Sequence, residues 1–101
     1  MTSRKKPRIA GLKLPDRCTI AEVADLNAHI ASLLADPAAQ EIRVDCTEVL
    51  AIDGASLQCL AAAARSTREG QRLVFVDPTP ELLRAAEWTG MGALFAPAPA
   101  P

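Results

Sequence analysis

Strand-like and helix-like stretches alternate along this chain, and that alternation limits the folds it can adopt. Three stretches have apolar patterns typical of strands, at residues 10–14, 42–46 and 73–76. Each is followed by a stretch with helical spacing or composition, at residues 20–34, about 55–68 and about 80–89. Strand-helix units repeated in this way form parallel sheets with right-handed crossovers. The sequence therefore predicts an α/β fold.

Capping signals predict where two of the helices begin. Thr19 and Glu22 form a Thr-x-x-Glu capping box, with the Thr19 hydroxyl placed for the Glu22 amide. Thr79 followed by Pro80 has the composition of an N-cap and a first helical residue. The first helix, which also has apolar residues at helical spacing, is the best defined element.

The remaining boundaries are predicted from glycine and from apolar runs. We expect Gly70 to end the second helix. The unbroken apolar run at residues 73–76 predicts a central parallel strand that is covered on both faces. A short turn or helix is expected at residues 94–95, after Gly90.

Length and composition indicate one domain. The 101 residues suffice for a single core. With 3% aromatic residues, that core must be built from Leu, Ile, Val and Ala. We expect a flexible basic N-terminus at residues 1–7, a domain at residues 8–95 and a disordered Ala-Pro tail at residues 96–101.

Net charge, hydropathy and cysteine content argue against nucleic-acid binding, membrane insertion and an oxidising compartment. A net charge of -1 gives no general attraction to nucleic acid, and no apolar stretch is long enough for insertion into a membrane. Cys18, Cys46 and Cys59 are an odd number without a C-x-x-C pair. This cysteine pattern favours a reduced, cytoplasmic location.

The chain has few residues with which to perform catalysis. It contains no glycine-rich phosphate-binding motif, which argues against a nucleotide cofactor. His29 is the only histidine, and it lies within the first predicted helix, so neither a metal site nor a nucleophile with its base is expected. Cys46 and Cys59 fit as small core residues. We therefore predict no catalytic residues, no metal and no cofactor.

One segment stands out as a candidate binding site, at the start of the second predicted helix. An acid, a glycine and small residues open this helix after an apolar approach, and the candidate partner-binding residues are Asp53, Gly54, Ala55, Ser56, Leu57 and Gln58. A helix N-terminus offers unpaired amides to a partner or an anion. Two interpretations remain open here, because Asp53 can also serve only as a cap and Gly54 only as a turn residue.

The same segment resembles the STAS (sulphate transporter and anti-sigma factor antagonist) family. Residues 52–57 are similar to the loop that opens the family's second helix, and residues 44–49, 70–76 and 79–95 are similar to neighbouring elements. The resemblance implies a mixed, mainly parallel sheet of about four strands with about four helices. The family commonly begins with a two-stranded hairpin, so the first edge strand here is expected to be missing or rudimentary. An uncovered edge makes a homodimer possible.

The loop departs from the family at the position that carries its regulation. In anti-sigma factor antagonists, a Ser or Thr directly after the loop Asp is phosphorylated by a partner kinase, whereas this chain has Gly54. Ser56 lies two positions further on and is the alternative phosphosite, since a phosphate in the first turn of a helix is electrostatically favoured.

The resemblance therefore implies a non-catalytic bacterial protein-protein interaction module in signalling or regulation. Its docking residues are expected around Asp53–Gln58, and its partner is a regulatory kinase, a receptor complex such as a chemotaxis cluster, or a transporter subunit. The alternatives are an anti-sigma factor antagonist in a partner-switching pathway, a subunit of a lipid-transport ATPase complex, and a binder of a small anionic ligand.

Overall fold

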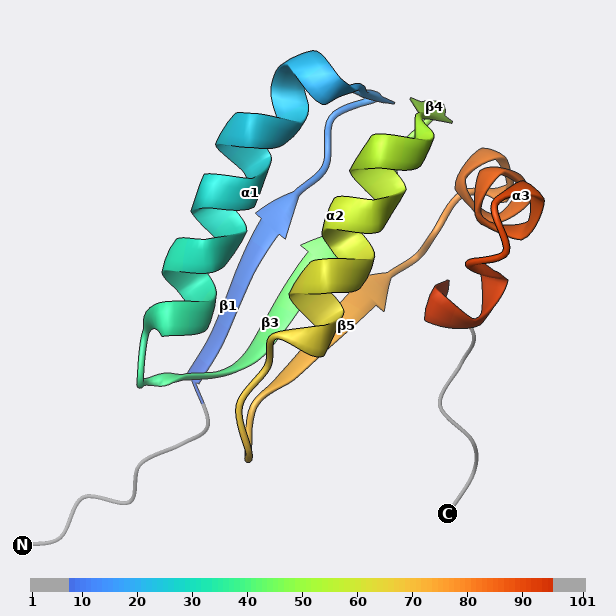
Figure 1. Ribbon diagram of the computed structural model, residues 1–101. Coiled ribbons are helices and arrows are strands. Elements are labelled where there is room, and N and C mark those ends of the chain that lie inside the picture. Colours follow the sequence, from blue (N-terminus) through green and yellow to red (C-terminus); the bar gives the residue numbers. More distant parts are fainter. Residues whose placement is uncertain (1–7, 96–101) are drawn as a thin grey trace, which may run out of the picture.

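The computed structural model describes residues 8–95, which form two small parallel sheets and the helices around them (Figure 1). The elements in chain order are β1 (Arg8–Lys13), β2 (Arg17–Cys18), α1 (Ile20–Ala35), β3 (Ala39–Asp45), β4 (Ala51–Ile52), α2 (Gly54–Arg65), β5 (Arg72–Val76), α3 (Pro80–Trp88) and the 3-10 helix η1 (Gly92–Phe95). The α/β prediction is confirmed. The predictions for residues 1–7 and 96–101, and for an edge strand ahead of β1, lie outside the described residues.

The main sheet has the strand order β1-β3-β5, and both of its pairings are parallel. The helices α1 and α2 lie side by side on one face of this sheet, and α3 lies beyond the end of β5 (Figure 1). The two-residue strands β2 and β4 pair in parallel as a second sheet, which the sequence did not predict. In the part of the chain that the structure describes, three α-helices and one 3-10 helix stand where about four helices were expected.

The prediction that residues 73–76 form a central strand is wrong. The central strand of the main sheet is β3, whereas β5 lies at an edge. Along β3 the buried residues Ile42 and Val44 alternate with the exposed Arg43, while Leu73 to Val76 of β5 are all half-buried. The residues of β5 are apolar because α3 and η1 cover part of this strand. A neighbouring strand on each side is not the reason.

The predicted helix starts are confirmed. At α1, the Thr19 N–H and hydroxyl donate to the Glu22 carboxylate at 3.2 and 2.7 Å, while the Glu22 amide bonds the Thr19 carbonyl. At α3, Thr79 Oγ1 accepts from the Leu82 N–H at 3.1 Å. The predicted end of α2 is wrong, because this helix ends at Arg65 and Gly70 occupies a later turn with a φ of 84°.

The core lies between the main sheet and the helices. It consists of small and branched side chains, as the scarcity of aromatic residues required, and its fully buried members include Leu14, Ile30, Ile42, Val44, Cys46, Val49, Leu57, Leu60 and Leu82. Cys18 is also buried, whereas Cys59 is half-buried. None of the described helices has the length and apolar character that crossing a membrane requires.

The buried thiols predict a loss of stability at alkaline pH. Burial raises the pKa of Cys18 to about 11 and that of Cys46 to about 12, from an ordinary value of 9.0. Above pH 9 the unfolded chain ionises these thiols while the folded chain does not. The free energy of unfolding should therefore fall by up to about 1.4 kcal/mol per pH unit for each thiol. Urea denaturation at pH 8 to 11 measures the fall, and a Cys46→Ala variant should show a shallower one.

Candidate functional site

The candidate site lies where β4 leads into the first turn of α2. Asp53 is the N-cap of α2, and its carboxylate accepts from the Ser56 N–H at 2.8 Å. The Asp53 N–H in turn donates to the carbonyl of Cys18 in β2 at 3.1 Å. Asp53 therefore fixes the start of α2 to a segment far away in the sequence. The capping role expected for this residue is confirmed.

Two of the six predicted docking residues face the core. Ser56 is 1% exposed, and its hydroxyl donates to the Cys18 carbonyl at 3.0 Å. Leu57 is completely buried. Neither side chain is available to a docking partner, which corrects the sequence-based prediction for these two residues. A kinase would reach the Ser56 hydroxyl only after the first turn of α2 had separated from β2.

Gly54 and Gln58 form the outward side of the same turn. Both are exposed, and they lie four residues apart on one face of α2. A Cβ added to Gly54 would meet nothing within 4 Å, and this glycine does not have a positive φ. The fold therefore does not require a glycine at this position. Asp53 and Ala55 are half-buried beside this surface.

Leu50 is a surface residue that the sequence analysis did not include in the site. Its side chain is 61% exposed although it stands directly after the buried Val49. The N–H groups of Leu50 and Ala51 both donate to the carbonyl of Asp16, at 2.8 and 3.1 Å, which holds this loop against the segment before β2. Val49 and Leu50 are both apolar and lie in the irregular segment between β3 and β4, so no periodic pattern in the sequence shows which of them is exposed. We define the docking surface as Leu50, Gly54 and Gln58.

Acidic groups surround this end of the molecule. Besides burial, the charges of Glu22, Asp53 and Asp16 each raise the pKa of the Cys18 thiol, which places all three carboxylates near it. Hydrogen bonds from Thr19 lower the pKa of Glu22, so this acid is ionised at neutral pH. Arg17 of β2 also lowers the pKa of Glu22, so the charges around Cys18 are of both signs, with three acids and one base. A partner with basic groups would complement this excess of acids.

Metal-ligating side chains are dispersed over the described part of the chain. No group of three or more His, Cys, Asp or Glu side chains within residues 8–95 is arranged to hold a metal ion. His29 is exposed on α1. The geometry at the start of α2 is that of a capped helix whose exposed residues, Gly54 and Gln58, can contact a protein partner.

Comparison with known proteins identifies the family. A family model described as "Mlab, STAS domain" matches residues 1–96. The chain belongs to the STAS domain family. The segment from Asp53 to Gln58 is thus the loop and first turn of a STAS domain, with Gly54 after the loop acid. No curated protein matches the sequence.

Two solved structures share the fold of this STAS domain. The anti-sigma factor antagonist SpoIIAA in its unphosphorylated form superposes with a TM-score of 0.73 at 14% identity, over 96% of this chain and 85% of that chain. The Bacillus cell fate determinant SpoIIAA in its phosphorylated form gives a TM-score of 0.68 at 14% identity, over 96% and 88%. At this identity the likeness establishes the STAS fold.

Proposed function

We propose that this STAS domain is a non-catalytic protein-protein interaction module in bacterial signalling or regulation. It docks its partner through the docking surface at the start of α2, and phosphorylation of that turn does not control the docking. The observation that carries this proposal is the exposed Gly54, which has open space around it and no hydroxyl, beside a Ser56 whose hydroxyl is buried.

The exposed Leu50 supports a protein as the partner. An exposed leucine can pack against apolar groups of a protein partner. Two backbone hydrogen bonds hold the Leu50 loop against Asp16, an exposed acid, so Leu50 is presented in a fixed position. We infer that the partner has an apolar pocket for Leu50 and basic groups around that pocket. The kinase, receptor-complex and transporter-subunit classes remain the candidates.

The geometry gives less support to the alternative functions. Antagonism of an anti-sigma factor by partner switching needs an accessible phosphosite, and Ser56 is the only hydroxyl between Asp53 and Gln58. A small anionic ligand at the start of α2 would meet the Asp53 carboxylate, which already accepts from the Ser56 N–H. That negative charge opposes a second anion at the same amides.

Substitutions on the docking surface test the proposal directly. Gly54→Glu places a charge in open space in the first turn of α2, where an acid is tolerated by the helix dipole. We expect Gly54→Glu and Leu50→Asp each to reduce partner capture from a lysate of the source organism by at least about tenfold. Quantitative mass spectrometry measures the capture, and identification of the lost partner distinguishes the three classes.

The matched control for this experiment is Gln40→Glu. Gln40 is exposed near the start of β3, at the end of the strand away from the first turn of α2, and the substitution adds the same charge. Capture should survive in this variant, and all three proteins should melt cooperatively. Undiminished capture by both Gly54→Glu and Leu50→Asp would show that the docking surface lies elsewhere.

A further inference from the structure

The edge of the main sheet at β5 has backbone groups that no described residue uses. The Val76 carbonyl accepts from the Cys46 N–H at 2.9 Å, so the backbone of Val76 faces β3. The N–H and C=O of one strand residue point to the same side, and the side alternates along the strand. The backbone groups of Leu73 and Phe75 therefore point to the open edge, and within residues 8–95 they have no hydrogen-bond partner.

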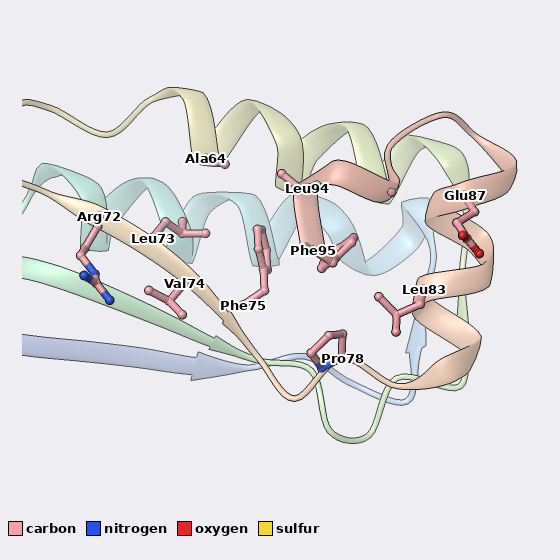
Figure 2. A pocket seen from close by; sticks show the side chains of 11 residues that line it. Ala64, Arg72, Leu73, Val74, Phe75, Pro78, Leu83, Glu87, Leu94 and Phe95 are labelled. Atoms are coloured by element: carbon pink, nitrogen blue, oxygen red, sulfur yellow. The ribbon is translucent and has the colours of Figure 1, made fainter. Parts of the chain in front are cut away.

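An apolar groove runs beside this edge. It encloses about 980 Å³ between β5, α3 and η1, and Figure 2 shows side chains from all three elements entering the same space. The Phe75 and Phe95 rings, with centroids 4.8 Å apart, form part of its wall. Leu83 of α3 also lines the groove and is 36% exposed. Apolar side chains of the groove are therefore exposed to water next to the unpaired backbone N–H and C=O groups of Leu73 and Phe75.

The two ends of the groove carry opposite charge. At one end, Arg72 and Arg43 share the single carboxylate of Glu41, at 3.0 and 2.6 Å, which leaves an excess of positive charge. Glu87 lies at the opposite end of the groove (Figure 2), and Asp77 is exposed directly after β5. Arg84, the only cation of α3, is not among the residues that line the groove.

We infer that β5 and this groove form a second docking site, for an extended apolar segment of a protein partner that adds a strand beside β5. In an extended segment, every second residue can hydrogen-bond the outward-facing backbone groups of Leu73 and Phe75. Alternate apolar side chains of the segment can fill the groove. We expect this segment to have an acidic side chain near Arg72 and a basic side chain near Glu87, which would complement the charges at the two ends of the groove. This inference does not depend on the docking surface at α2.

Two synthetic peptides test the inference. One has the sequence Glu-Val-Thr-Val-Thr-Val-Lys and the other has the same residues in reverse order, so that one suits a parallel and the other an antiparallel strand. We expect one of them to bind the full chain and to slow amide exchange at Leu73 and Phe75 by about tenfold or more. The Val74 amide, which faces β3, should be unchanged. A peptide N-methylated at the residues that face β5 is the control and should not bind.

Variants of the protein separate this site from the one at α2. Leu83→Asp alters a groove residue that is partly exposed, and we expect it to weaken peptide binding by about tenfold, with a smaller loss for Arg72→Gln. Leu50→Asp, which tests the docking surface, should leave peptide binding unchanged.

Three results would overturn the inference. The first is that neither peptide binds at about 1 mM. The second is slow exchange at Leu73 and Phe75 in the free protein at all concentrations, which would mean that the chain already fills its own edge. The third is exchange that slows as protein concentration rises, which would make a second copy the occupant.

Discussion

Ser56→Arg should prevent cooperative folding of this domain. The Ser56 side chain is 1% exposed and lies between α2 and β2, so the much larger arginine side chain would not fit in a space that holds one hydroxyl and would push α2 away from β2. We expect a loss of more than about 4 kcal/mol in the free energy of unfolding, which is most of the stability of a marginal domain of this size. Thermal unfolding followed by circular dichroism measures the loss.

Ser56→Ala is the control that isolates the hydroxyl. The Cys18 carbonyl keeps a donor in this variant, because the Asp53 N–H also bonds it. The expected loss is therefore only about 1 kcal/mol. A stable, cooperative Ser56→Arg variant would contradict the packing of α2 against β2, and it would reopen Ser56 as a surface residue.

Leu57→Ala has the second largest expected effect. Leu57 is fully buried in the core beneath the first turn of α2, and its replacement by alanine removes the isopropyl group and leaves a cavity. The free energy of unfolding should fall by about 2–5 kcal/mol, measured by urea denaturation. Leu50→Ala, on the exposed side of the same segment, should change it by less than about 0.5 kcal/mol. Equal losses of stability for the two variants would contradict the placement of Leu57 in the core and of Leu50 on the surface.

The three α-helices and the three strands of the main sheet could be predicted from the sequence because their signals are local. The capping box at Thr19 and the Thr79-Pro80 pair each specify a helix start within a few residues. The edge position of β5 could not be predicted in this way, since a half-buried apolar run beside α3 and η1 has the same pattern as a central strand. The two-residue strands β2 and β4 are too short to carry a periodic signal.

The candidate site was predicted in position but only partly in orientation. The sequence located the segment from Asp53 to Gln58, and the N-cap role of Asp53 followed from its residue type. Which side chains face outward depends on the bond between Ser56 and Cys18, two residues 38 positions apart, and no local pattern encodes that contact. Leu50 could not be predicted as exposed because it follows the equally apolar Val49 in a segment without regular structure.

The open space around Gly54 has a consequence for how this protein can evolve. A serine there would meet no atom of the domain, would stand directly after the loop acid and would be exposed, and a single nucleotide change converts some glycine codons into serine codons. The scaffold would not need to be rebuilt to accept it. On the proposed function, a constitutive binder and one with a phosphorylatable residue after the loop acid thus differ by a single substitution on this backbone.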